Sequence, residues 1–128
     1  MQNIVKTRGN SVKDGTHLII DLKGCRNLER LSDKRFIESF LLELVGIAKM
    51  KAITKPNVLY YEHEEKEESG VTGFVIISDS HISIHTYPFK KSLYLDLFSC
   101  KIFDSKKIVG YIKGIFQPES ITDKLVKR

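Results

Sequence analysis

Apolar residues recur along this chain at two different spacings, and each spacing predicts a different kind of element. Alternating apolar and polar residues are typical of a strand with one buried face, whereas apolar residues three or four positions apart are typical of a helix with one buried side. The alternation predicts strands at residues 16–23, 56–62, 71–78, 81–87 and 92–99, with a short final strand near 120–126.

Two longer segments carry the helical spacing. The first runs from about Asp33 to Lys49, and Ser32 stands where a side chain can cap its first turn. The second runs from about Ser105 to Phe116 and ends before Pro118. Each has one apolar stripe, which in the first helix consists of Phe36, Ile37, Phe40, Leu41, Leu44, Val45 and Ala48.

The order of these elements predicts an α+β fold, a two-layer α/β sandwich in which an antiparallel sheet carries both helices on one face. The 128 residues are enough for one packed domain spanning 1–128, and no Pro/Gly/Ser-rich linker suggests a second. The other sheet face then needs cover. A symmetric homodimer that pairs through the sheet side would supply it.

Alternation also places candidate chemistry on the strands. Ile82 and Ile84 would point to one face, and His81, Ser83 and His85 to the other. In the next strand the leucines at 93, 95 and 97 would oppose a second set, which consists of Tyr94, Asp96, Phe98 and Cys100. If the two strands form a hairpin through residues 88–91, Cys100 approaches the strand end that holds Ser80.

Four spaced segments, residues 15–25, 70–73, 80–86 and 96–100, resemble the short prokaryotic S-adenosylmethionine decarboxylases. Members of that family cut their own chain before a serine, which becomes a pyruvoyl cofactor. The segments are similar to the family's amino-terminal strand, the approach to its cleavage strand, its processing motif and the strand with its catalytic cysteine. The resemblance implies a lyase of polyamine (spermidine) biosynthesis that decarboxylates S-adenosylmethionine through a Schiff base.

The same resemblance implies that the chain is a zymogen. Autocatalytic cleavage between Asp79 and Ser80 would give a β chain, 1–79, and an α chain, 80–128. Ser80 would be the pyruvoyl precursor, and its hydroxyl would attack the Asp79 carbonyl in an N-to-O acyl shift before β-elimination. The resulting ketone forms a Schiff base with the substrate amine and takes up electrons as carbon dioxide leaves.

Three further residues, His85, Thr72 and Cys100, match family positions. The resemblance implies that His85 assists the elimination, and that Thr72, where the family usually has serine, supports processing. Cys100 would be the proton donor of decarboxylation, a suitable role for a thiol. Tyr87 is assigned to substrate binding.

Three positions depart from the family pattern and leave the substrate open. Asp79 replaces the usual glutamate before the serine, Phe89 stands where a glutamate usually holds the ribose hydroxyls, and Lys66 falls where an aromatic residue usually stacks on adenine. There are two alternatives. The chain is an arginine or ornithine decarboxylase derived from the family, or it is a homologue that does not cleave itself. The acidic run at 62–68 could receive a cationic amino acid, although such runs are typically solvated loops.

Charge and composition bear on partners and location. The net charge of +5 would suit nucleic acid, but the basic residues are dispersed and carry no recognised motif, so a small-molecule substrate and no nucleic acid are expected. No metal site is expected either, because the histidines lack metal-ligand spacing. A signal-peptide stretch and a segment of membrane-span length are both absent from the sequence, which predicts a cytoplasmic protein with reduced thiols and no membrane contact.

Overall fold

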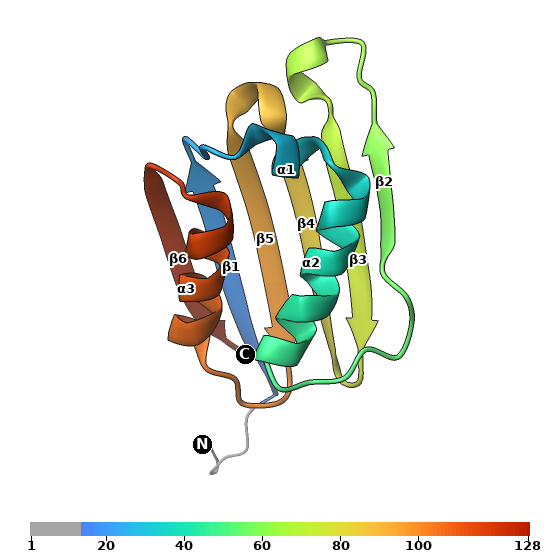
Figure 1. Cartoon of the computed structure of the whole chain (residues 1–128). Coiled ribbons are helices and arrows are strands. Elements are labelled where there is room, and N and C mark those ends of the chain that lie inside the picture. Colours follow the sequence, from blue (N-terminus) through green and yellow to red (C-terminus); the bar gives the residue numbers. More distant parts are fainter. Residues whose placement is uncertain (1–13) are drawn as a thin grey trace.

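The computed structural model describes residues 14–128, which form one antiparallel sheet and three α-helices (Figure 1). The strands occur in the sheet in the order β2-β3-β4-β5-β1-β6, and every neighbouring pair is antiparallel. The strands are β1 (Thr16–Lys23), β2 (Asn57–Tyr61), β3 (Gly70–Ile77), β4 (Ser80–Tyr87), β5 (Ser92–Ser99) and β6 (Ser120–Lys127). The helices are α1 (Leu28–Ser32), α2 (Lys34–Ile47) and α3 (Ser105–Phe116).

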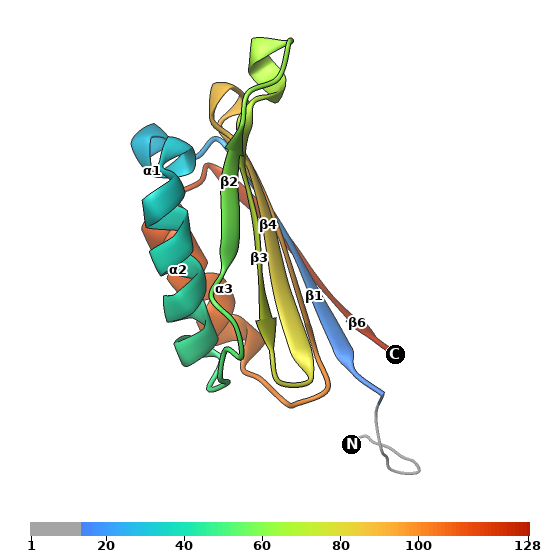
Figure 2. The same cartoon turned by 90° about the vertical axis from the view of Figure 1, so that its right-hand side faces the viewer.

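The helices all lie on one side of the sheet, and the opposite sheet face is uncovered (Figure 2). The core forms between these two layers, because β1, β3, β4 and β5 each turn a row of buried apolar residues toward the helices. Ile82 and Ile84 of β4 and Leu97 of β5 are fully buried, as are Ile108 and Phe116 of α3. The predicted two-layer α+β sandwich is confirmed, with both long helices on the same face.

The start of the first long helix differs from the prediction. Asp33, not Ser32, caps α2, and its carboxylate accepts hydrogen bonds from the backbone N–H groups of Arg35 and Phe36. The expectation for Ser32 was wrong because this residue closes the short helix α1, where its hydroxyl donates to the Leu28 carbonyl. The helix α1 was not predicted, since five residues are too few to display a periodic apolar stripe.

One end of β4 is fixed by two close contacts. The Thr86 hydroxyl accepts a hydrogen bond from the Val71 N–H (2.9 Å) and donates one to the Leu31 carbonyl (2.6 Å), which joins β3, β4 and α1. Beside it, Gly70 approaches the Thr86 backbone so closely that an added Cβ would lie 1.8 Å from the Thr86 carbonyl oxygen. Only glycine fits this position without displacing a strand.

Candidate functional site

Ser80 begins strand β4 directly after a tight turn. Ile77 pairs with Ser80, so Ser78 and Asp79 form the two-residue connection between β3 and β4. Asp79 has a left-handed backbone conformation, with φ of 66°, which aspartate tolerates better than most residues. The peptide bond predicted to be cleaved therefore lies between a left-handed turn residue and the first residue of a central strand.

The Ser80 side chain points toward the helices, not toward the open sheet face. It is 7% exposed, and its hydroxyl donates a hydrogen bond to the Ser99 hydroxyl at 2.7 Å. Ser99 is the direct partner of Ser80 across the β4–β5 pair and also accepts a hydrogen bond from the Lys101 N–H at 2.8 Å. The hydroxyl of the predicted pyruvoyl precursor is thus buried and held by a second serine.

Cys100 lies beside the predicted cleavage site. Its backbone N–H donates to the Asp79 carbonyl oxygen, with 3.3 Å between nitrogen and oxygen. Its thiol is exposed and contacts the Asp14 carbonyl oxygen at 3.5 Å. The β4–β5 hairpin brings Cys100 to the Ser80 end of β4, as the predicted strand pairing requires.

Thr72 and His85 form a second pair at a different place. They are direct partners across β3 and β4, and the Thr72 hydroxyl oxygen lies 3.2 Å from Nδ1 of His85. His85 is five residues after Ser80, which is about 16 Å along a strand. The described chain therefore brings Ser80 to Cys100 and Thr72 to His85, but it does not bring the two pairs together.

A cavity of ≈ 270 Å³ opens at the Thr72–His85 pair. Its walls combine aromatic, hydroxyl, imidazole and carboxylate groups, which suits a small polar ligand. The lining residues are Tyr61, His63, Glu68, Gly70, Thr72, His85, Thr86 and Tyr87. Tyr87, assigned to substrate binding from the sequence, is among them.

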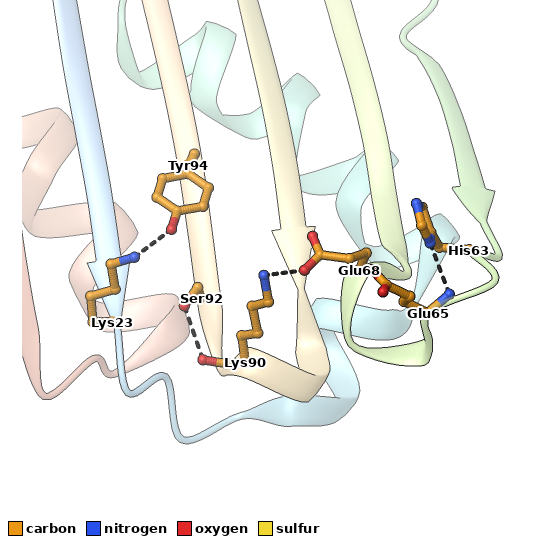
Figure 3. A network of polar contacts seen from close by, with 7 residues as sticks. All are labelled: Lys23, His63, Glu65, Glu68, Lys90, Ser92 and Tyr94. Atoms are coloured by element: carbon orange, nitrogen blue, oxygen red, sulfur yellow. Dashed lines mark hydrogen bonds and ion pairs between the residues drawn. The ribbon is translucent and has the colours of Figure 1, made fainter.

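The two unusual residues at positions 66 and 89 contact each other near this cavity. The Lys66 ammonium lies 5.1 Å from the centre of the Phe89 ring, within cation–π range. Next to them, the Lys90 ammonium lies 2.5 Å from a carboxylate oxygen of Glu68, a contact drawn in Figure 3. This hydrogen bond to Glu68 is the main reason why the pKa of Lys90 is raised.

A chain of polar and aromatic groups continues from Lys90 across the open face. Lys90 also lies over the Tyr87 ring at 5.5 Å, and Tyr87 packs edge-to-face with Tyr94. The Tyr94 hydroxyl accepts a hydrogen bond from Lys23 (Figure 3). Lys90 thus contacts two residues that line the cavity, the carboxylate of Glu68 and the ring of Tyr87.

The two thiols differ in environment. Cys25 is 1% exposed, and burial raises the pKa of its thiol to about 11. It lies in the core, as expected for a small apolar residue after a strand, whereas Cys100 is exposed. Of the two, only Cys100 is accessible to a ligand at the surface.

Two groups near the predicted cleavage site were not expected from the sequence. They are Ser99 and the backbone N–H of Cys100, which contact Ser80 and the Asp79 carbonyl. Glu68, which belongs to the acidic run at 62–68, lines the cavity. The position of Ser99 could have been predicted, because it continues the alternation of Leu93, Leu95 and Leu97 and must therefore face the core beside Ser80. The hydrogen bond of the Cys100 backbone could not have been predicted, because the sequence does not fix the register of strand pairing.

Within residues 14–128, no three His, Cys, Asp or Glu side chains are grouped so that they could hold a metal ion. None of the helices described there has the length and apolar character needed to cross a membrane.

The fold is an α+β sandwich in which a buried serine hydroxyl, a cysteine and the peptide bond predicted to be cleaved lie together at the end of a central strand. A family model described as S-adenosylmethionine decarboxylase matches residues 16–128. The S-adenosylmethionine decarboxylase proenzyme of Clostridium botulinum (strain Langeland / NCTC 10281 / Type F) is 40% identical over 100 residues, covering 77% of this chain and 80% of that protein. The chain belongs to the S-adenosylmethionine decarboxylase family.

Two further relatives support this assignment across most of the chain. The proenzyme of the same description from Methanococcus maripaludis (strain C5 / ATCC BAA-1333) is 33% identical over 115 residues, covering 89% of this chain and 88% of that protein. The crystal structure of the adenosylmethionine decarboxylase from Aquifex aeolicus VF5 superimposes with a TM-score of 0.73 at 26% identity, covering 92% of each chain. The similarity extends through both halves of the sheet.

Proposed function

We propose that this protein is a self-processing, pyruvoyl-dependent decarboxylase that acts on S-adenosylmethionine in spermidine biosynthesis. The observation that carries the proposal is the arrangement around one peptide bond. The Asp79 carbonyl oxygen accepts a hydrogen bond from the Cys100 N–H, and the adjoining Ser80 hydroxyl is held by Ser99. A polarised carbonyl next to an oriented hydroxyl is what an intramolecular acyl shift requires.

Cleavage and formation of the pyruvoyl group take three steps. First the Ser80 oxygen bonds to the Asp79 carbonyl carbon, the carbon–nitrogen bond breaks, and the hydroxyl proton is transferred to the Ser80 nitrogen. Next a base removes the Ser80 α-proton, a double bond forms between Cα and Cβ, and the bond between Cβ and the ester oxygen breaks, so that Asp79 leaves as a carboxylate. Water then converts the resulting enamine, through its imine, to a ketone and releases ammonia. The products are chains 1–79 and 80–128, the second with a pyruvoyl end.

The pyruvoyl group supplies a ketone that combines with the substrate amine and withdraws electrons as carbon dioxide leaves. The chain's own residues prepare this position. Cys100 lies next to it with an exposed thiol, which is the group we assign as the proton donor. That thiol has to stay reduced, and a cytoplasmic location is therefore part of the proposal.

We propose that the active protein is a homodimer joined through the open sheet face. Thr72 and His85, assigned to processing, are about 16 Å along β4 from Ser80 and cannot assist it within one protomer. The open face also holds half-exposed apolar side chains, namely Leu59, Tyr61, Phe74 and Ile76. A two-fold pairing of these faces with antiparallel β4 strands would bring His85 of the partner subunit to the Ser80 end.

Arginine or ornithine is the second candidate substrate, and contacts at and near the cavity support this alternative. Lys66 and Phe89 contact each other through a cation–π interaction. Lys66 therefore provides no ring to stack on the adenine, and Phe89 provides no carboxylate to bind the ribose. Glu68, in contrast, lines the cavity and already binds an ammonium group, that of Lys90. A carboxylate of this kind could bind a guanidinium or ammonium end of an amino acid.

The first test is the intact mass of freshly purified wild-type protein and of a Ser80→Ala variant. The proposal predicts two fragments, 1–79 and a pyruvoyl-ended 80–128, in the wild type and one uncut chain in the variant. The cut protein is then assayed for carbon dioxide release from S-adenosylmethionine, arginine and ornithine. An uncut wild-type chain would instead support the non-processing homologue, and release from an amino acid alone would favour the second candidate.

A further inference from the structure

Ser99 contacts the group that starts the cleavage. Ser99 is 1% exposed, and its hydroxyl oxygen accepts the hydrogen bond of the Ser80 hydroxyl at 2.7 Å. We propose that Ser99 is a positioning residue for self-cleavage, which holds the Ser80 hydroxyl for attack on the Asp79 carbonyl. The inference rests on the proposed function, because it concerns the same cleavage.

The hydrogen bond has a direction that matters for reactivity. Ser80 is the donor, so the contact draws its proton toward Ser99 and leaves electron density on the Ser80 oxygen, the atom that must bond to carbon. It also selects one orientation of a side chain that is otherwise free to rotate among staggered positions. Ser99 is unchanged by the reaction, since the proton ends on the Ser80 nitrogen.

Ser99 is itself held in place by the backbone. The Lys101 N–H donates to the Ser99 hydroxyl oxygen at 2.8 Å, which fixes the acceptor that Ser80 uses. The intervening residue, Cys100, sends its N–H to the Asp79 carbonyl oxygen. Residues 99–101 therefore contact both reacting partners, the hydroxyl through a side chain and the carbonyl through the backbone.

Ser92 provides a matched control on the same strand. It is also buried, at 4% exposure, and it starts strand β5 whereas Ser99 ends it. Its hydroxyl donates to the Lys90 carbonyl and has no part in the Ser80 site. Loss of either hydroxyl removes a hydrogen bond from a buried serine of β5, but only one change affects the hydroxyl of Ser80.

The experiment follows cleavage of full-length chains during cell-free synthesis, by intact mass against time, for wild type, Ser99→Ala, Ser99→Thr and Ser92→Ala. We expect Ser99→Ala to slow cleavage about 100-fold, the size of effect that a misplaced reacting group causes. Ser99→Thr restores a hydroxyl at the same place and should cleave at nearly the wild-type rate, as should Ser92→Ala. Thermal unfolding of each variant in a Ser80→Ala background measures the structural cost separately.

Cleavage of Ser99→Ala at the wild-type rate or faster would overturn the inference and leave the proposed function intact. An equal slowing in Ser92→Ala would also overturn it, because the effect would then follow from loss of any buried hydroxyl of β5. If Ser99→Ala does not fold, Ser99→Cys takes its place, since sulfur is a weaker acceptor of similar size, and the same two outcomes decide. An uncut wild-type chain would overturn the proposed function and this inference with it.

Discussion

The two ends of strand β4 hold different halves of the predicted chemistry. At the first end, Ser80 is buried against Ser99 and the peptide before it contacts Cys100. At the other end, His85 faces the open side of the sheet beside Thr72 and a cavity of ≈ 270 Å³. The first end has the peptide bond predicted to be cleaved and a buried hydroxyl, whereas the second has a cavity and an imidazole.

This difference follows from the two-residue period of a strand. Ser80, Ile82 and Ile84 are two residues apart and point to the helix side, whereas His85, at an alternate position, points to the open side. A hydroxyl and an imidazole five residues apart on one strand are thus separated both in length and in face. The proposed dimer would remove the separation along the strand, whereas the Ser80 hydroxyl would stay on the helix side of the sheet, away from the interface.

The largest expected effect comes from mixing two inactive variants. Ser80→Ala lacks the nucleophile and His85→Ala lacks the imidazole, so each alone should remain without mature α chain. If the site forms across a dimer, the mixed dimer has one complete site, made of Ser80 from the His85→Ala chain and His85 from the other. Co-expression should then yield cut His85→Ala chains, in roughly half of the copies for random pairing.

Mass spectrometry distinguishes the two chains in that mixture, because the variants differ in mass. A Ser80→Ala chain carrying a second His85→Ala change is the matched control and should rescue nothing. If no cut chain appears although the mixed dimer is isolated through two different tags, then the two ends of β4 do not act across the interface.

The Cys100→Ala variant separates self-cleavage from substrate decarboxylation, the two reactions proposed at the Ser80 end of β4. The variant keeps the backbone N–H that contacts the Asp79 carbonyl but loses the thiol, so cleavage should proceed while turnover falls about 100-fold, as expected for loss of a general acid. Fragment analysis and carbon dioxide release measure the two reactions on one sample. Cys25→Ala is the control for a thiol lost elsewhere. Wild-type turnover in Cys100→Ala would contradict the proton-donor assignment.

Much of the fold was predictable because the periodicities are strong. Strands β1 and β5 and helix α3 lie at the expected positions, since each combines a clear apolar pattern with a defined end such as Pro118. Helix α1 and the cap at Asp33 were missed, because two adjacent cap-forming residues, Ser32 and Asp33, cannot be ranked from the sequence alone.

The positions of the candidate site residues on the sheet were predictable in part. Alternation correctly assigned His81, Ser83 and His85 to one face, and the β4–β5 hairpin brought Cys100 to the Ser80 end. The distance between Ser80 and His85 follows from the strand itself. The contact between Lys66 and Phe89, in contrast, depends on two short 3₁₀ turns, Lys66–Glu68 and Pro88–Lys90, whose packing has no sequence period.

Gly70→Ala should weaken the cavity end of β4 through packing alone. The new methyl group would lie 1.8 Å from the Thr86 carbonyl oxygen, a backbone atom that moves only with its strand. We expect a loss of about 2 to 3 kcal/mol in the free energy of unfolding, measured by urea denaturation in the Ser80→Ala background. Gly46→Ala is the control. It lies on the exposed side of α2 with no atom within 4 Å of the added carbon, and it should stabilise by up to about 1 kcal/mol.

The smallest expected effect is a pH dependence of the folding stability that is caused by the buried thiol of Cys25. Burial raises the pKa of Cys25 to about 11 in the folded chain, from 9.0 for an unperturbed thiol. Below pH 9 the thiol is protonated in both states. Between pH 9 and 11 the unfolded chain loses this proton and the folded chain keeps it, so stability should fall as pH rises, by at most about 2 kcal/mol.

Urea denaturation at pH 8, 9 and 10 tests this dependence in a Ser80→Ala chain and in the same chain with Cys25→Ala. The difference in stability between the two should narrow as the pH rises, because alanine does not titrate. A constant difference for Cys25→Ala across the range would mean that the core thiol ionises as readily in the folded chain as in the unfolded one.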